Sequence, residues 1–264
     1  RDPDVYVFSD RIRQTIQLAL LLLWAAGIAV LERGLAPRWR RAAALLAIAT
    51  GVQMLVMLQG RTGWLTGLGV LLFVLHARTG WKGLAAGAAA AAVVVAAVVS
   101  GGMAGPARVA GTLGEIRDYR EQGTSNATGE RIEMWSNAAR MFASSPLVGH
   151  GIESYPTLSA RMYGEKGRVP LAIYHDPHQE FLYVGAELGL AGLLLLVGGL
   201  VALWRRAGRF GDRWTWIVRG AVVIYVAAGL ANCLINVGWT GYFFGLLLAL
   251  AAGRSLAMPR EARP

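Results

Sequence analysis

The chain has 264 residues, of which 55% are hydrophobic and only 16% are charged, and its formal net charge is +10. A soluble domain of this length does not carry so many apolar residues in blocks that recur along most of the sequence. We therefore expect an all-α integral membrane protein. A charge this positive would suggest a nucleic-acid partner in a soluble protein, but the arginines have a better explanation below, and we expect no nucleic acid to bind.

The sequence contains several apolar segments that are long enough to span a membrane. A spanning helix needs roughly 20 mainly apolar residues, because the hydrocarbon layer is about 30 Å thick and each residue rises about 1.5 Å. We predict seven spans, over residues 14–32, 42–60, 62–77, 83–100, 180–204, 215–236 and 239–253. The chain then divides into membrane helices within 1–100, a large helical loop over 101–179, and membrane helices with a tail over 180–264.

The basic residues indicate which side of the membrane each loop occupies. With seven spans, the clusters within 33–41, 78–82, 205–213 and 254–263 all fall on one side. The positive-inside rule makes that side cytoplasmic. The opposite side receives the turn at Gly60-Arg61-Thr62 and the loop 101–179. Because the sequence begins at Arg1 without a signal-peptide pattern, we expect a preceding portion with further spans.

The outer loop has an organisation of its own. Residues 114–122 predict a short polar helix, and a second helix is predicted from Glu130 to about Ser144. In the second, Ile132, Trp135, Ala139 and Phe142 recur at the spacing of one apolar helix face. The segment 147–155 that follows is rich in glycine, and we expect it to lie along the membrane surface.

Five arginines and a histidine stand out on the outer side. Arg61 lies at the lipid boundary, where a charge needs an anionic partner or must reach the aqueous interface. Arg131 is either an ordinary solvated helix residue or a ligand-binding one, and Arg140, Arg161 and Arg168 are alternatives to it. His178 directly precedes the fifth span, where it is either a helix cap or a group that accepts a proton near neutral pH. Asp176 or Glu180 would orient it.

The surroundings of His178 carry a resemblance to a known family. His178-Gln179, nine residues, and then Gly189-Leu-Ala-Gly192-Leu193 resembles the signature of bacterial O-antigen ligases. Gln59-Gly-Arg61-Thr-Gly63 resembles the arginine–glycine turn of the O-antigen ligase and polymerase superfamily. Glu130-Arg131 through Pro146-Leu-Val-Gly149-His-Gly151 resembles its outer loop. The resemblance covers roughly Arg61 to Leu200, and it implies a GT-C-like membrane fold of which this chain would form the C-terminal part.

The resemblance also implies a reaction and a site. O-antigen ligases transfer a polysaccharide from undecaprenyl diphosphate to a sugar hydroxyl of the lipid A core, at the periplasmic face of the bacterial inner membrane. The essential histidine of the family falls on His178, which we predict to be the general base. Its essential arginines fall on Arg61 and Arg131, which we predict to bind the diphosphate, with Gln179 and Arg140 as further substrate contacts. Direct attack on the anomeric carbon predicts inversion of configuration.

We expect no cofactor and no metal. Asp2-Pro-Asp4 and His175-Asp-Pro-His178 contain metal-ligating residue types, but Pro177 breaks the helical spacing that would align the two imidazoles, and the arginines already supply positive charge for the diphosphate. The predicted partners are therefore the lipid-linked glycan, the lipid A core and membrane lipids.

Three alternative functions stay open. An O-antigen polymerase uses the same donor, although the Gly-x-x-Gly spacing favours the ligase. A protein O-oligosaccharyltransferase of the same superfamily would transfer the glycan to a Ser or Thr side chain. In a membrane transporter, Arg61 and His178 would bind or relay charge without bond formation, but the sequence lacks the internal repeats and paired broken spans typical of that class.

Overall fold

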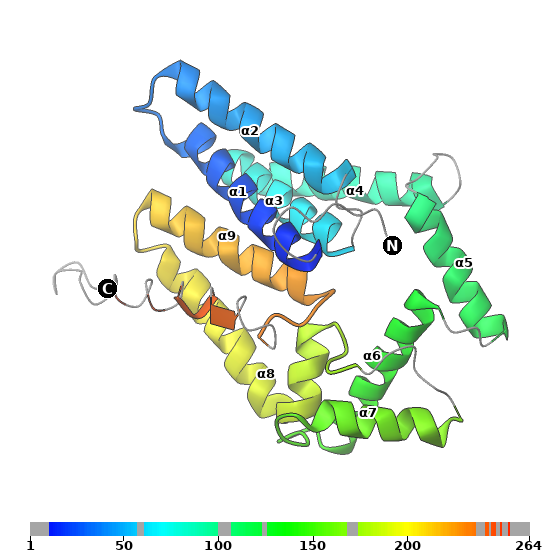
Figure 1. The fold of residues 1–264 in the computed structure, drawn as a ribbon. Helices are drawn as coiled ribbons and strands as arrows, with labels where there is room; N and C mark the ends of the chain where they lie inside the picture. The colour runs from blue at the N-terminus through cyan, green and yellow to red at the C-terminus, as the bar shows by residue number, and fades with distance from the viewer. Residues whose placement is uncertain are drawn as a thin grey trace. The chain divides into compact units, whose positions relative to one another are not determined.

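The computed structural model describes residues 11–56, 61–99, 107–122, 126–167, 174–235, 241, 242, 244–246, 249 and 253 (Figure 1). Within these residues every regular element is a helix and none is a strand, as predicted for an all-α protein. The helices are α1 (Arg11–Leu31), α2 (Pro37–Val56), α3 (Arg61–Thr79), α4 (Trp81–Val99), α5 (Ala107–Gln122), α6 (Ala127–Ser144), α7 (Ser154–Glu165), α8 (Glu180–Ala207) and α9 (Asp212–Gly229).

Two of the described helices are long and apolar enough to cross a membrane, Gln14–Leu31 within α1 and Glu180–Ala207, which is all of α8. They correspond to the first and fifth predicted spans. Helices α2, α3 and α4 form where the second to fourth spans were predicted. Asp2, Asp4, Gly60, Arg168, most of the seventh predicted span (239–253) and the basic cluster after 253 lie outside the described residues.

The sixth predicted span, 215–236, is shorter than expected. Helix α9 ends at Gly229, and residues 230–235 are not helical. A Cβ atom at Gly229 would lie 3.1 Å from the Cβ of Glu180, so this glycine permits a close approach to the start of α8. The chain leaves the helix at this point, and Asn232 and Cys233 are both buried.

The chain forms two compact units. The first contains residues 1–84, 199–228 and 234–264, and the second contains residues 85–198 and 229–233. In the first unit α1 packs against α2 and α3. Trp216 of α9 donates a hydrogen bond of 2.8 Å to the carbonyl of Leu23 in α1, and the ring of Phe73 in α3 lies 5.0 Å from the Trp216 ring. These contacts hold α1, α3 and α9 together.

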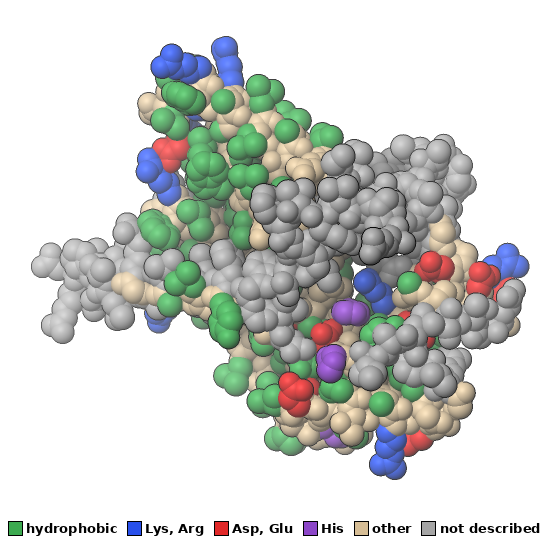
Figure 2. Space-filling view, viewed as in Figure 1, with side chains coloured by type: hydrophobic (Ala, Val, Ile, Leu, Met, Phe, Trp, Pro, Cys, Tyr) green, Lys and Arg blue, Asp and Glu red, His purple; other side chains and the backbone are tan. Residues whose placement is uncertain are grey.

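Charged residues gather at one end of the first unit. Arg213, at the start of α9, forms an ion pair with Glu32, just after α1. Arg40 of α2 donates to the carbonyl of Ala29 at 3.2 Å. The α1–α2 turn and the α8–α9 turn therefore lie at the same end, and Figure 2 shows blue and red side chains there. The two turns that carry the largest arginine clusters of the sequence thus lie at the same end of the first unit.

The core of the second unit lies between α6, α7 and the first part of α8. It contains Ala138 and Met141 of α6, Tyr155 of α7, Tyr183 and Ala186 of α8, and Cys233. The buried face of α6 differs from the predicted one: Glu130, Glu133, Met134, Asn137, Ala138 and Met141 are buried, whereas Trp135 and Ala139 are exposed. The prediction of the apolar stripe was wrong because α6 buries polar side chains that find partners on neighbouring helices.

Candidate functional site

Helix α8 is not continuous, and the break explains the glycine signature. Gly189 has φ 63° and ψ −156°, outside the helical region, and α8 changes direction sharply there (Figure 1). The backbone N–H groups of Leu190 and Ala191 would bond to the carbonyls of Ala186 and Glu187 in a regular helix. Here they donate to the carbonyls of Pro146 and Leu147, at 2.7 and 3.2 Å.

The carbonyls that the break releases are also satisfied by the same loop. The N–H of His150 donates to the carbonyl of Ala186 at 3.1 Å, and that of Gly151 donates to Glu187 at 2.8 Å. The segment 146–151 therefore replaces two missing backbone hydrogen bonds of α8 by four hydrogen bonds between itself and the helix. We call this segment the docking loop.

The close approach of the two backbones requires glycine on both sides. A Cβ atom at Gly189 would lie 2.6 Å from the backbone nitrogens of Val148 and Gly149. A Cβ atom at Gly149, which has φ 66°, would lie 2.3 Å from the backbone carbon of Glu187. Side chains are excluded at both positions, since real Cβ atoms do not approach backbone so closely. The predicted fifth span of 180–204 is thus two helical pieces, of which the first belongs to the core described above.

His178 lies in the irregular segment 174–179 that leads into the first piece of α8. An oxygen of Asp176 accepts a hydrogen bond of 2.8 Å from the backbone N–H of His178, which closes a short turn. His178 has φ 50°, in the left-handed region that a non-glycine residue rarely adopts. The carboxylate of Asp176 therefore holds the backbone of His178 in this conformation.

The same carboxylate oxygen lies 3.3 Å from Nδ1 of His178. The Asp176 side chain is 14% exposed and the His178 side chain is 36% exposed, so the pair is sheltered on the aspartate side and open on the histidine side. A carboxylate next to Nδ1 favours the tautomer with the proton on Nδ1 and the lone pair on Nε2. Nε2 is then the atom that can accept a proton.

The pKa of Asp176 reflects these contacts. Burial by itself raises the pKa of this carboxyl group, but hydrogen bonds and charge from His178, together with a hydrogen bond from the thiol of Cys233, outweigh it. The net effect is a pKa below the ordinary value of an aspartate. Asp176 is therefore an anion at neutral pH and stays a hydrogen-bond acceptor for His178. Asp176 and Glu180 were the two candidates for orienting His178. The structure places Asp176 next to the His178 ring.

Helix α6 supports the loop that carries His178. The indole N–H of Trp135 donates to the carbonyl of Pro177 at 3.0 Å. Arg131 lies one helical turn before Trp135, and its charge acts on Tyr174, whose ring is 6.3 Å from the His178 ring. Burial and the neighbouring Glu130 raise the pKa of Tyr174, and Arg131 partly offsets this. Arg131 thus lies on α6 one turn before Trp135, the residue that contacts the loop of His178.

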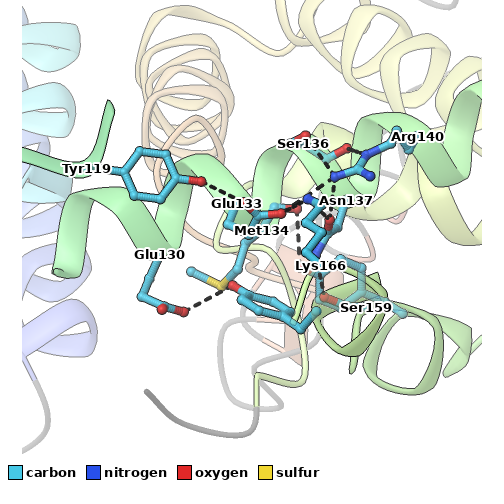
Figure 3. Close-up of polar contacts among 11 residues, drawn as sticks. Tyr119, Glu130, Glu133, Met134, Ser136, Asn137, Arg140, Ser159 and Lys166 are labelled. Carbon is cyan, nitrogen blue, oxygen red and sulfur yellow. Dashed lines mark hydrogen bonds and ion pairs between the residues drawn. The ribbon is translucent and has the colours of Figure 1, made fainter. Parts of the chain in front are cut away.

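A second polar cluster ties α5, α6 and α7 together (Figure 3). Glu133, which is buried, accepts a hydrogen bond of 2.5 Å from Tyr119 of α5 and forms an ion pair with Lys166, which follows α7. Arg140 lies 3.5 Å from Glu133 and donates to the side-chain oxygen of Asn137 at 3.0 Å. These contacts satisfy the buried acid.

The remaining predicted residues occupy different places. Arg140 follows Arg131 by nine residues, and at about 100° per residue it lies on the opposite face of α6, within the cluster around Glu133. The side-chain oxygen of Gln179 accepts from the backbone N–H of Leu182 at 2.5 Å and so caps α8. Arg61 is the first residue of α3 in the first unit, and its side chain lies outside the described part of the chain.

Three contributors to the site had no clear signal in the sequence. Trp135 was assigned to an apolar stripe, and its indole N–H instead holds the loop. Tyr174 and Cys233 were not connected with His178, and Cys233 reaches Asp176 only because α9 ends early. The spacing of Asp176 and His178, two residues apart, is the one local signal that could have indicated the turn.

These observations define a class of protein: a helical chain with helices of membrane length and an acid–histidine pair at the start of one of them. A family model described as O-antigen ligase matches residues 42–197, more than half of the chain. The chain belongs to the O-antigen ligase family. The matched range includes Arg61, Arg131, His178, Gly189 and the docking loop. A search of curated proteins returned no match.

Proposed function

We propose that this protein is an O-antigen ligase, a glycosyltransferase that transfers O-antigen polysaccharide from undecaprenyl diphosphate to a sugar hydroxyl of the lipid A core. The observation that carries the proposal is the His178 ring held by Asp176, with Nδ1 and Oδ1 3.3 Å apart. Family membership supplies the substrate class, and the geometry supports the role of the histidine. A sugar hydroxyl needs a base to become a nucleophile, and Nε2 of His178 is the atom available for this task.

In the proposed step Nε2 of His178 takes the proton of the acceptor hydroxyl while its oxygen attacks the anomeric carbon of the donor sugar. The bond between that carbon and the phosphate oxygen breaks, and undecaprenyl diphosphate leaves with the bonding electrons. Attack from the side opposite the leaving group inverts the anomeric carbon. The anionic Asp176 stabilises the protonated ring and fixes its orientation, as an acid behind a histidine does in other enzymes.

Positive charge is needed where the diphosphate departs. Arg131 lies by the same loop as His178, and a guanidinium offers paired donors that match phosphate oxygens. Arg61 is proposed as the second group of this clamp, on the strength of the family resemblance of its turn. Gln179 retains its side-chain amide as a donor after capping α8, whereas Arg140 would have to leave the cluster around Glu133 to touch a substrate. Among the predicted substrate contacts, Arg131 has the strongest support from the geometry.

We infer that the protein is a multi-pass protein of the bacterial inner membrane, with the His178 loop on the periplasmic side. The two helices of membrane length and the shared end of the arginine clusters support this orientation. We further propose that the chain has seven membrane-spanning helices in a GT-C-like arrangement. No metal or cofactor takes part in the proposed step.

The experiment that tests the function offers one donor to several acceptors. The full chain, reconstituted in lipid vesicles, receives undecaprenyl-diphosphate glycan together with lipid A core, a second lipid-linked glycan, or a Ser/Thr-containing protein. A lipid A-linked product supports the ligase. A longer lipid-linked glycan, or a glycosylated protein, as the sole product would contradict it and indicate a polymerase or a protein O-oligosaccharyltransferase. Movement of the donor across the vesicle without bond formation would indicate a transporter.

A further inference from the structure

The docking loop carries an apolar surface that the ligase reaction does not use. Leu147, Val148 and Ile152, which directly follows the loop, are 69%, 71% and 75% exposed. Loops of water-soluble regions rarely expose three large aliphatic side chains within six residues. The single ionisable side chain between them, His150, turns back to α6, where its Nε2 lies 2.9 Å from the carbonyl of Met141. His150 is itself exposed, and the exposed, charged Glu153 follows Ile152, so the exposed side chains of residues 147–152 are mainly but not wholly aliphatic.

This surface continues directly into α8. The hydrogen bonds from Leu190 and Ala191 place the docking loop at the break of the helix. Beyond the break, α8 itself exposes Leu190, Leu194, Leu195 and Val197, with Leu195 at 80%. Hydrophobic side chains lie at the surface over α8 in Figure 2. The exposed aliphatic side chains of the loop thus lie next to the exposed apolar piece of α8 that follows the break. Helix α8, counted across the break, has the length and composition of a membrane span.

The backbone of the loop also suits contact with hydrocarbon. Irregular backbone is costly in lipid unless its polar groups are bonded within the protein. Here the N–H groups of Gly149, His150 and Gly151 and the carbonyls of Pro146 and Leu147 have backbone partners. The carbonyl of Gly149 accepts from the hydroxyl of Ser145 at 2.7 Å. An ordinary surface loop leaves most of these groups to water.

We propose that the docking loop and Ile152 dip into the outer leaflet, where Leu147, Val148 and Ile152 contact lipid acyl chains. The proposal rests on the inferred membrane location of α8 and adds a lipid-binding role for a segment outside the predicted spans. It has a consequence for the site. Residues 180–188 separate the loop from His178 by about 14 Å of helix. A loop anchored in lipid therefore keeps His178 within that distance of the acyl chains, near the level where a lipid-linked diphosphate lies.

Site-directed spin labelling measures this contact. Val148→Cys and, as an independent position, Ile152→Cys are labelled with a nitroxide in the full chain, in vesicles of phosphatidylethanolamine and phosphatidylglycerol. Leu195→Cys in α8 serves as the lipid-facing reference and Ala160→Cys, on the exposed side of α7, as the aqueous one. The unsubstituted chain, whose only cysteine, Cys233, is 2% exposed, gives the background.

Oxygen concentrates in the hydrocarbon and a neutral nickel chelate concentrates in water, so their collision rates with the label report depth. We expect oxygen collisions to dominate at Val148, Ile152 and Leu195, and nickel collisions to dominate at Ala160. Nickel collisions at Val148 and Ile152 with oxygen collisions at Leu195 would overturn the lipid contact and leave the membrane location intact. Exclusion of both reagents from Val148 and Ile152 would also overturn it, because a protein surface would then cover the loop. Nickel collisions at Leu195 as well would overturn the membrane location itself.

Discussion

Replacement of Gly189 by alanine tests whether the break in α8 is a required feature. The added Cβ atom would lie 2.6 Å from backbone atoms of the docking loop, which cannot move aside as a flexible side chain would. The backbone at φ 63° and ψ −156° belongs to a region that is nearly exclusive to glycine, and a side chain there costs about 1–3 kcal/mol.

The four backbone hydrogen bonds between the docking loop and α8 add to this cost. Each contributes about 1 kcal/mol net, and an alanine that restores a straight helix would break all four while regaining two within α8. The expected loss in free energy of unfolding is about 3–5 kcal/mol, a large part of the roughly 5–15 kcal/mol that a folded domain has.

The assay is a urea titration of the purified full chain in mild detergent, followed by far-UV circular dichroism and tryptophan fluorescence. Gly198→Ala is the matched control, because Gly198 lies in the same helix and a Cβ atom there meets nothing within 4 Å. That variant should change the free energy of unfolding by less than about 1 kcal/mol, in the stabilising direction. If Gly189→Ala proved as stable as Gly198→Ala, the account of the glycine signature as a backbone docking site would be wrong.

Four further predictions concern the acidic residues and the metal question. Asp176→Asn should lower the transfer rate about tenfold or more, because a neutral amide does not stabilise the protonated His178 ring. Since the pKa of Asp176 is depressed in the folded state, its stabilising contribution is present above the ordinary aspartate pKa of about 3.9 and is lost as the pH falls through its lower folded value. The urea-unfolding difference between the wild type and Asp176→Asn should therefore be larger at pH 7 than at pH 3, and an equal difference would contradict the hydrogen-bonded pair of Asp176 and His178. Glu133→Gln should cost about 1–3 kcal/mol in the same titration, since Lys166 and Arg140 lose the buried negative charge that they pair with. Glu165→Gln, in an exposed pair with Arg161, should change stability by less than about 0.5 kcal/mol. Similar costs for the two variants would show that the cluster around Glu133 is not structural. EDTA should leave ligation in vesicles unchanged, and a loss of activity restored by magnesium or manganese would reveal a metal requirement.

The positions of most helices follow from local features of the sequence. Apolar length located α1, α3 and α8, and the helix predicted from Glu130 corresponds to α6, which begins three residues earlier. Local sequence features did not predict helices whose position depends on contacts between distant parts of the chain. Helix α7 was not predicted, and the loop predicted over 147–155 overlaps only its first two residues. The N-cap residue of α7, Glu153, provides no capping bond; instead Glu187 of α8 accepts from the backbone N–H of Tyr155 at 3.3 Å.

The candidate site was only partly predictable for the same reason. The resemblance singled out His178, Arg131 and the glycine spacing, but no local pattern reveals that Gly189 opens a helix to receive a loop forty residues away. The buried face of α6 was misjudged because Glu133 and Asn137 look solvent-exposed by type, and only partners such as Tyr119 and Lys166 make their burial favourable. The buried face of α6 is set by side-chain partners that are distant in sequence, and the hydrophobic periodicity of the helix does not show these partners.

The central claim, that His178 is the general base, is tested most directly by one comparison of rates. Initial rates of ligation are measured for His178→Ala and for His175→Ala, which replaces an exposed histidine in the same loop, at equal protein in the same vesicles. Loss of a general base costs about 10²- to 10⁴-fold. We expect a loss of this size for His178→Ala, with unchanged circular dichroism, and a rate near that of the wild type for His175→Ala. Near-normal turnover by folded His178→Ala would contradict the account.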